Sequence, residues 1–121
     1  MISRECDIGS AADYADRTAY RVEAAGRTIV VVRNGNTFYA LRDECPHQGA
    51  PLSAGRVAGT VLQSGIGEPV GYGRADKILR CPWHGWEFDL ETGRSLVDPH
   101  RACVRAYPVR FEGGRVIVQM T

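Results

Sequence analysis

Glycine and proline divide this chain into short segments, and this feature most constrains the folds open to it. They number 14 and 6 of 121 residues, and runs of β-branched and aromatic residues lie between them. No apolar period of 3.6 residues, the pattern of an amphipathic helix, is sustained anywhere. The sequence therefore predicts an all-β fold, a small antiparallel barrel or sandwich.

Three pairs of β-type runs predict hairpins. The strongest turn signal is Asn34-Gly35, and Gly113-Gly114 marks a second turn. Residues 1–16 show no clear period, so we expect a loosely anchored N-terminal segment, with β structure from about Tyr20. The predicted hairpins pair residues 28–32 with 37–41, 78–80 with 86–90, and 107–111 with 116–120.

One stretch is unusually rich in glycine. Seven of the 14 glycines lie between Gly49 and Gly73, and residues 64–69 include Pro69, which lacks an amide donor. We expect a Gly-rich insertion over about residues 57–77, either a long surface loop or an irregular hairpin. A functional loop and a neutral insertion are both open interpretations.

Charge and length exclude several classes of protein. The chain has 15 Lys and Arg against 14 Asp and Glu, a net charge of +1, so no broad cationic field favours nucleic acid or anionic lipid. No apolar run reaches the roughly 18–20 residues of a membrane span, and the N-terminus lacks the pattern of a signal peptide. We expect residues 1–121 to form a single cytoplasmic domain with no nucleic-acid or membrane partner.

Two short segments combine cysteine with histidine: Cys45-Pro46-His47 and Cys81-Pro82-Trp83-His84. In a reducing compartment such segments indicate a metal or redox site rather than disulfides. A structural zinc site is one interpretation, although zinc ligands usually pair cysteine with cysteine and histidine with histidine. Ligands separated by one residue suit two neighbouring irons better, as in a binuclear iron–sulfur cluster.

The chain resembles the Rieske 2Fe-2S proteins over residues 45–52 and 81–89. This resemblance implies the family fold, a β-rich base domain with a cluster-binding subdomain, here about residues 43–91. It also implies one Rieske-type 2Fe-2S cluster, with the two cysteines on the inner iron and the two histidines on the outer iron. The implied ligands are Cys45, His47, Cys81 and His84.

The sequence differs from the membrane-complex branch of that family. Ala50 and Trp83 stand where that branch has two further cysteines that form a disulfide, and Trp86 and Phe88 replace a serine and a tyrosine. Losing hydroxyl donors to the cluster destabilises its reduced form. We therefore expect a reduction potential in the lower part of the roughly −150 to +300 mV Rieske range.

The resemblance implies a soluble one-electron carrier that links a ferredoxin reductase to a terminal oxidoreductase such as a ring-hydroxylating oxygenase. The chain has three histidines, and only His100 remains beyond the implied ligands, so the facial triad of an oxygenase cannot be built. We therefore expect no enzyme activity from the chain alone. The alternative is a non-catalytic or redox-sensing subunit of a larger oxidoreductase, similar to nitrite reductase small subunits.

Two other groups of residues receive simpler interpretations. Cys6 and Cys103 fit no ligand spacing, so they are ordinary thiols or, as an open alternative, a regulatory pair. Arginines near the C-terminal strands alternate with apolar residues and indicate a solvated strand face. They are Arg80, Arg94, Arg101, Arg105 and Arg110.

Overall fold

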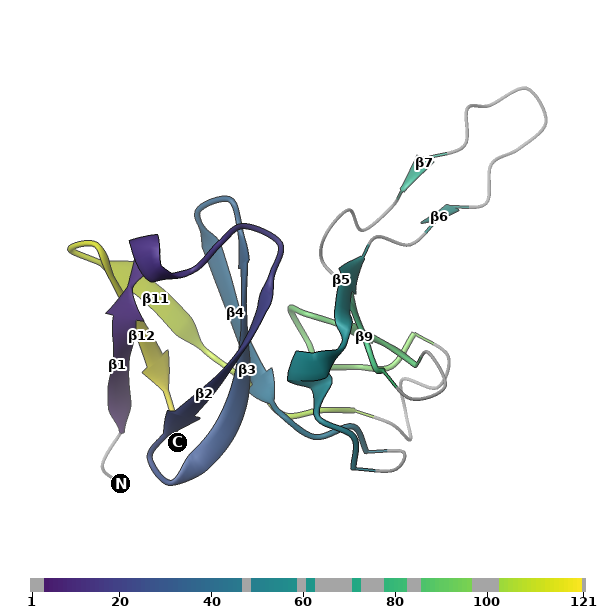
Figure 1. Cartoon of the computed structure of the whole chain (residues 1–121), viewed down its shortest axis with the longest axis horizontal. Helices are drawn as coiled ribbons and strands as arrows, with labels where there is room; N and C mark the ends of the chain where they lie inside the picture. The colour runs from purple at the N-terminus through teal and green to yellow at the C-terminus, as the bar shows by residue number, and fades with distance from the viewer. Residues whose placement is uncertain are drawn as a thin grey trace.

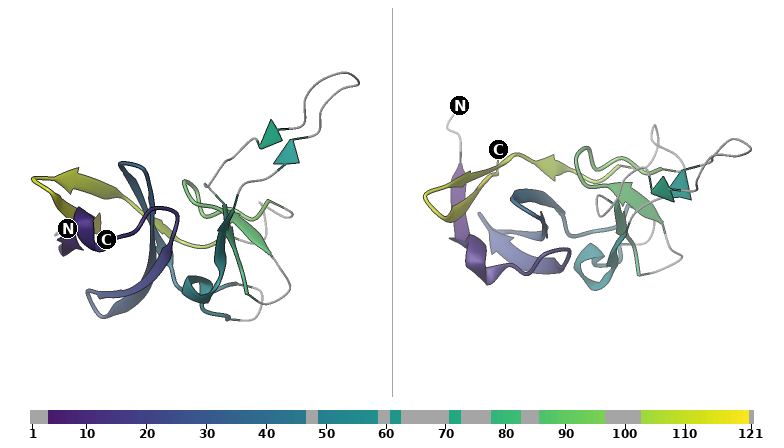
Figure 2. Two further views of the ribbon diagram at one scale, coloured as in Figure 1. Left: turned by 45° about the horizontal axis from the view of Figure 1, so that its top comes forward. Right: turned by 90° about the horizontal axis from the view of Figure 1, so that it is seen from above.

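The computed structural model of the chain describes residues 4–46, 49–58, 61–62, 71–72, 78–82, 86–96 and 103–120. Within these ranges the protein is all-β apart from two single-turn 3-10 helices, which confirms the predicted fold class. Figure 1 shows a larger base formed by β1–β4 with β11 and β12, beside a smaller part that carries β5 and β9. The two views in Figure 2 show these parts side by side as well.

The first sheet of the base has the strand order β10-β4-β3-β2. The hairpin predicted around Asn34-Gly35 is formed by β3 and β4, and its last residue pair is Asn34 with Thr37. Gly35 has a φ of +62°, a left-handed conformation that glycine adopts without steric cost. The strands are β2 (Ala19–Ala24), β3 (Arg27–Asn34), β4 (Thr37–Arg42) and β10 (Ala106–Tyr107).

The second sheet of the base has the order β1-β12-β11. The expectation of a loosely anchored N-terminal segment is therefore wrong, because β1 lies in this sheet. β1 (Glu5–Ser10) pairs antiparallel with β12 (Arg115–Gln119). The 3-10 helix η1 (Ala11–Asp13) follows, and the hydroxyl of buried Tyr14 donates a 2.6 Å hydrogen bond to the Ile8 carbonyl. The partner strand lies at the other end of the chain, so no local turn signal announces this pairing.

The predicted strand over residues 107–111 is divided at Pro108. Before it, β10 pairs with β4 in the first sheet, and after it β11 (Val109–Glu112) pairs with β12 in the second. Proline has no amide donor, so the chain leaves one ladder and joins the other at this residue. The β11–β12 hairpin is confirmed.

The smaller part holds a third sheet of order β5-β8-β9, and the predicted pairing of residues 78–80 with the segment after Trp86 is confirmed. The 3-10 helix η2 (Leu52–Ala54) precedes this sheet. Two residue pairs join β6 (Val61–Leu62) to β7 (Gly71–Tyr72), which favours the irregular hairpin over the unpaired loop. The sheet strands are β5 (Arg56–Ala58), β8 (Ile78–Arg80) and β9 (Glu87–Asp89).

Strand β3 contributes to two apolar cores. Ile29 and Val31 belong to a core between the two base sheets, whereas Val30 and Val32 belong to a core shared with the smaller part. Side chains of a strand alternate between its faces, so four consecutive apolar residues fill both cores. This shared packing fixes the smaller part against the base.

The Thr92-Gly93 turn packs closely against the chain that returns to the base. The Val104 amide donates a 2.6 Å hydrogen bond to the Gly93 carbonyl. A Cβ at Gly93 would overlap the Val104 carbonyl oxygen, and the φ of Gly93 is +76°. Glycine is therefore required at this position for both space and conformation.

Candidate metal centre

Cys45 lies in a tight turn three residues after the end of β4. Its amide donates a 2.8 Å hydrogen bond to the Ala50 carbonyl, and the Gly49 amide donates a 2.8 Å bond to the Cys45 carbonyl. Gly49 has a φ of +74°, which the turn requires. The side chain of Cys45 is thereby buried, with 1% of the residue exposed.

A carboxylate and a serine close the loop that contains this turn. The Asp43 carboxylate accepts hydrogen bonds of 2.7 Å from the Ser53 amide and 2.6 Å from the Ser53 hydroxyl. The Asp43 side chain has no exposed surface, and the Arg21 guanidinium lies 3.8 Å away. This contact, the Asp43–Ser53 clamp, ties the end of β4 to η2 and so limits the freedom of the loop between them.

Cys81 follows β8 directly, at the start of the second loop. Its amide donates a 2.7 Å hydrogen bond to the Trp86 carbonyl, which continues the β8–β9 ladder. The next residue pair, Arg80 with Glu87, is also an ion pair of 3.1 Å between the side chains. Cys81 is 3% exposed, so the second loop presents a buried thiol in the same way as the first.

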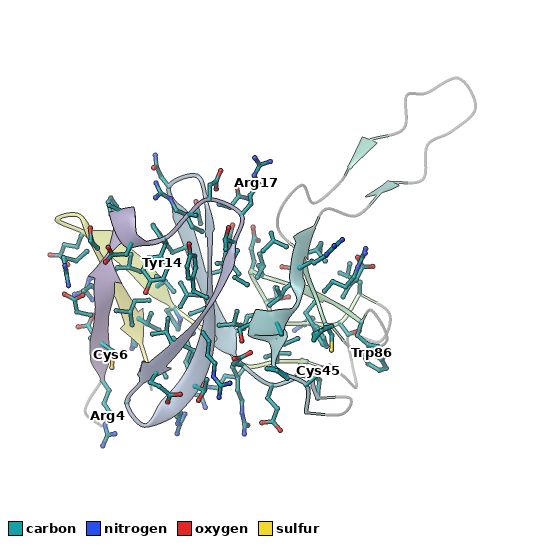
Figure 3. All side chains as sticks on the ribbon, in the orientation of Figure 1. Arg4, Cys6, Tyr14, Arg17, Cys45 and Trp86 are labelled. Carbon is teal, nitrogen blue, oxygen red and sulfur yellow. The ribbon has the colours of Figure 1, made fainter. Side chains whose placement is uncertain are left out.

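Both cysteines belong to one apolar core, as the lower right of Figure 3 illustrates for Cys45 and its surroundings. Phe88 is fully buried in this core, and the Trp86 ring stacks on it with a centroid distance of 6.5 Å. Packing is therefore the role of Trp86 that the structure supports. The apolar surroundings keep water from the two sulfur atoms.

These residues fit an iron–sulfur cluster. None of the four cysteines, all of which lie in described parts of the chain, forms a disulfide, so both buried thiols are available as ligands. Thiolates are the usual protein ligands of such clusters. His47, His84, His100 and Trp83 lie outside the described residues, and within the described ranges no three His, Cys, Asp or Glu side chains gather.

The two remaining cysteines lie outside the two loops. Cys6 is half-buried on β1 opposite Val118, and exposed Cys103 lies opposite Arg94 in an isolated β-bridge. Neither forms a disulfide, which agrees with their interpretation as ordinary thiols. Sequence reasoning missed Asp43 and Ser53. The one signal that could have indicated their contact is that they lie ten residues apart, on either side of the first cysteine–histidine segment.

Comparison with known proteins identifies the family. Residues 5–108 match the family described as the Rieske [2Fe-2S] domain. The fold, the two buried thiols and this match define a small iron–sulfur electron-transfer protein that carries a Rieske 2Fe-2S cluster. The chain belongs to the Rieske 2Fe-2S domain family.

Two curated proteins illustrate the sequence similarity. The chain is 29% identical over 109 residues to the 3-phenylpropionate/cinnamic acid dioxygenase ferredoxin subunit of Escherichia coli K12, covering 90% of this chain and 87% of that one. It is 28% identical over 90 residues to the ferredoxin component of the alkene monooxygenase system of Xanthobacter autotrophicus, covering 74% and 60%. Both relatives are ferredoxin components of oxygenase systems.

Solved structures confirm the fold. The ferredoxin of carbazole 1,9a-dioxygenase from Nocardioides aromaticivorans is 25% identical and superposes with a TM-score of 0.76, covering 96% of this chain and 97% of that one. A chain assigned as an NADH-dependent nitrite reductase small subunit from Mycobacterium tuberculosis has a TM-score of 0.79 at 24% identity, covering 100% and 98%. In the described part of this chain, no helix is long and apolar enough to cross a membrane.

Proposed function

We propose that Cys45, His47, Cys81 and His84 bind the Rieske cluster, with the cysteines on the inner iron and the histidines on the outer iron. The observation that carries this proposal is the burial of two thiols, from two separate loops, in one apolar core. A histidine follows the first thiol by two residues and the second by three. Two cysteines with two histidines form the mixed ligand set of Rieske centres. The cluster-binding portion then spans about residues 43–91.

The chain's own residues prepare this site. When bound, the cluster accepts and releases one electron at a time. Hydrogen bonds donated by the amides of Cys45 and Cys81 hold the two turns, and the Asp43–Ser53 clamp restrains the first loop. Buried Phe88 and Leu52 exclude water on the core side of the two thiols.

We propose that the electrons pass from a ferredoxin reductase to a terminal oxygenase in the cytoplasm. The relatives named above serve dioxygenase and monooxygenase systems. A further solved relative, 28% identical with a TM-score of 0.72, is a ferredoxin in complex with its oxygenase in carbazole 1,9a-dioxygenase. These similarities support an oxygenase as the acceptor and leave the oxidised substrate open.

A second candidate is a permanent small subunit of a larger oxidoreductase. The observation that favours it is the superposition on the nitrite reductase small subunit, with a TM-score of 0.79. A carrier and a permanent subunit differ in assembly, so co-expression with the neighbouring genes followed by size-exclusion chromatography separates them. A carrier elutes at the 13.3 kDa of the single chain, whereas a subunit co-elutes with a larger partner.

The ligand proposal is tested by cysteine variants of the chain purified under argon. Cys45→Ala and Cys81→Ala are expected to lose the visible Rieske absorption and the acid-labile sulfide. Cys6→Ser and Cys103→Ser are matched controls, because neither thiol lies in the two loops, and they are expected to keep both. Full iron and sulfide content in Cys45→Ala or Cys81→Ala would contradict the ligand set.

A further inference from the structure

A cleft of about 660 Å³ lies where the base meets the first loop. Four arginines and two carboxylates line it, from the β2–β3 hairpin, the end of β4 and the segment before β10. Gly49, at the end of the Cys45 turn, also lines it. We call it the arginine cleft and define it by Arg21, Arg27, Arg42, Asp43, Glu44 and Arg105.

The carboxylates of the cleft are already engaged. Asp43 is held in the clamp with Ser53, and Glu44 forms a 3.0 Å ion pair with Arg42. Among the described residues, no carboxylate pairs with Arg27 or with Arg105. The Arg105 guanidinium instead lies over the Tyr107 ring, 5.3 Å from its centroid.

The cleft is therefore more basic than the chain as a whole. Four guanidinium groups against two carboxylates leave an excess of two positive charges, whereas the net charge of the entire chain is +1. Exposed arginines such as Arg27 and Arg105 present planar donor groups that match carboxylates in bidentate geometry. The chemistry of the cleft selects a carboxylate-bearing ligand.

We propose that the arginine cleft is the docking site for an acidic segment of the protein that exchanges electrons with this chain. The inference rests on the proposed function, because Glu44 and Gly49 place the cleft beside the turn that carries Cys45. A partner seated there lies next to the first ligand loop, where electron transfer needs it. Complementary charge raises the rate of encounter and fixes the orientation of the complex.

The test uses anionic probes on the cluster-containing protein. A hexaglutamate peptide is titrated at low ionic strength by calorimetry, and the oxidation rate of the reduced protein by ferricyanide is measured by stopped flow. Arg27→Glu and Arg105→Glu are each expected to weaken peptide binding about fivefold, the effect of losing an exposed ion pair worth about 1 kcal/mol. Both variants are also expected to slow oxidation by ferricyanide.

Arg4→Glu is the matched control, because it makes the same change in net charge at an exposed residue on the far side of the base from Cys45 (Figure 3). Wild-type affinity and rate in this control support the site. Equal losses in all three variants, or the absence of peptide binding to the wild type, would overturn it. The visible spectrum of each variant separates these outcomes from failure of the proposed function, which would appear as a missing cluster.

Discussion

The Asp43–Ser53 clamp gives the sharpest prediction about stability of the ligand loop. Ser53→Ala removes the hydroxyl that donates a 2.6 Å hydrogen bond to the Asp43 carboxylate. The carboxylate has no exposed surface, so water cannot replace the lost donor without opening of the loop. The Ser53 amide still donates its own bond, so half of the clamp remains.

The magnitude follows from the charge on the acceptor. A hydrogen bond to a charged group stabilises a folded protein by about 1.5–3 kcal/mol. A free-energy change of 1.4 kcal/mol is a factor of ten in an equilibrium constant, so opening of the loop should become about ten to a hundred times more favourable. Because the first loop must open to release its ligands, loss of the cluster should accelerate by a similar factor.

The assay is the decay of visible absorption under argon in a moderate concentration of guanidinium chloride. The control is Thr28→Ala, which also removes a side-chain hydrogen bond, 2.7 Å to Glu23, but at an exposed position. Its decay rate should stay within about twofold of the wild type, since surface changes of this kind rarely exceed about 0.5 kcal/mol. A Ser53→Ala rate no faster than that of Thr28→Ala would refute the reasoning.

Three further predictions concern other parts of the fold. Gly93→Ala should lower the free energy of unfolding by about 1–3 kcal/mol more than Gly26→Ala. Both glycines have a φ of +76°, but of the two only Gly93 has backbone atoms where a Cβ would lie. Equal thermal midpoints of the two variants would contradict this. The Arg115 guanidinium and the Gly9 amide hold the pKa of Asp7 below its ordinary value of 3.8. The ionised Asp7 carboxylate therefore stabilises the folded state above that pH, and this stabilisation is lost as the pH falls through the lower, folded-state pKa. Asp7→Asn should therefore be less stable than the wild type at neutral pH by an amount that disappears in acid, and a constant difference in denaturation midpoint would contradict it. Replacing the part of the insertion that follows β5, residues 59–77, by a tight turn should slow electron transfer to the acceptor and leave the cluster spectrum unchanged, because β5 and its pairing with β8 are kept. An unchanged rate would favour the neutral insertion.

Local patterns predicted much of the fold. The Asn34-Gly35 turn and the glycine pair at residues 113–114 correctly located two hairpins, because two-residue turns depend on nearby residues. Pairing of β1 with β12 was missed, since it joins the two ends of the chain and neither strand indicates its partner. The division at Pro108 was also missed, because proline ends one ladder without showing where the next begins.

The cysteine–histidine motif was recognisable in the sequence, whereas the residues that support its loops were not. The Cys-x-His and Cys-x-x-His spacings indicated the motif directly, and the structure buries both cysteines in one core. Asp43 carried no signal in the sequence and Arg105 was assigned to a solvated strand face, although they help to form the clamp and the arginine cleft. Their roles depend on contacts between segments far apart in the sequence, which composition and spacing do not reveal.

The measurement that tests the central claim most directly is pulsed electron paramagnetic resonance on the dithionite-reduced protein, prepared with ¹⁵N-labelled histidine. A rhombic Rieske signal with couplings to two histidine nitrogens, together with about two irons and two sulfides per chain, is the predicted result. His47→Ala and His84→Ala should each abolish it. A silent sample that contains zinc, or a signal without nitrogen coupling, would contradict the account.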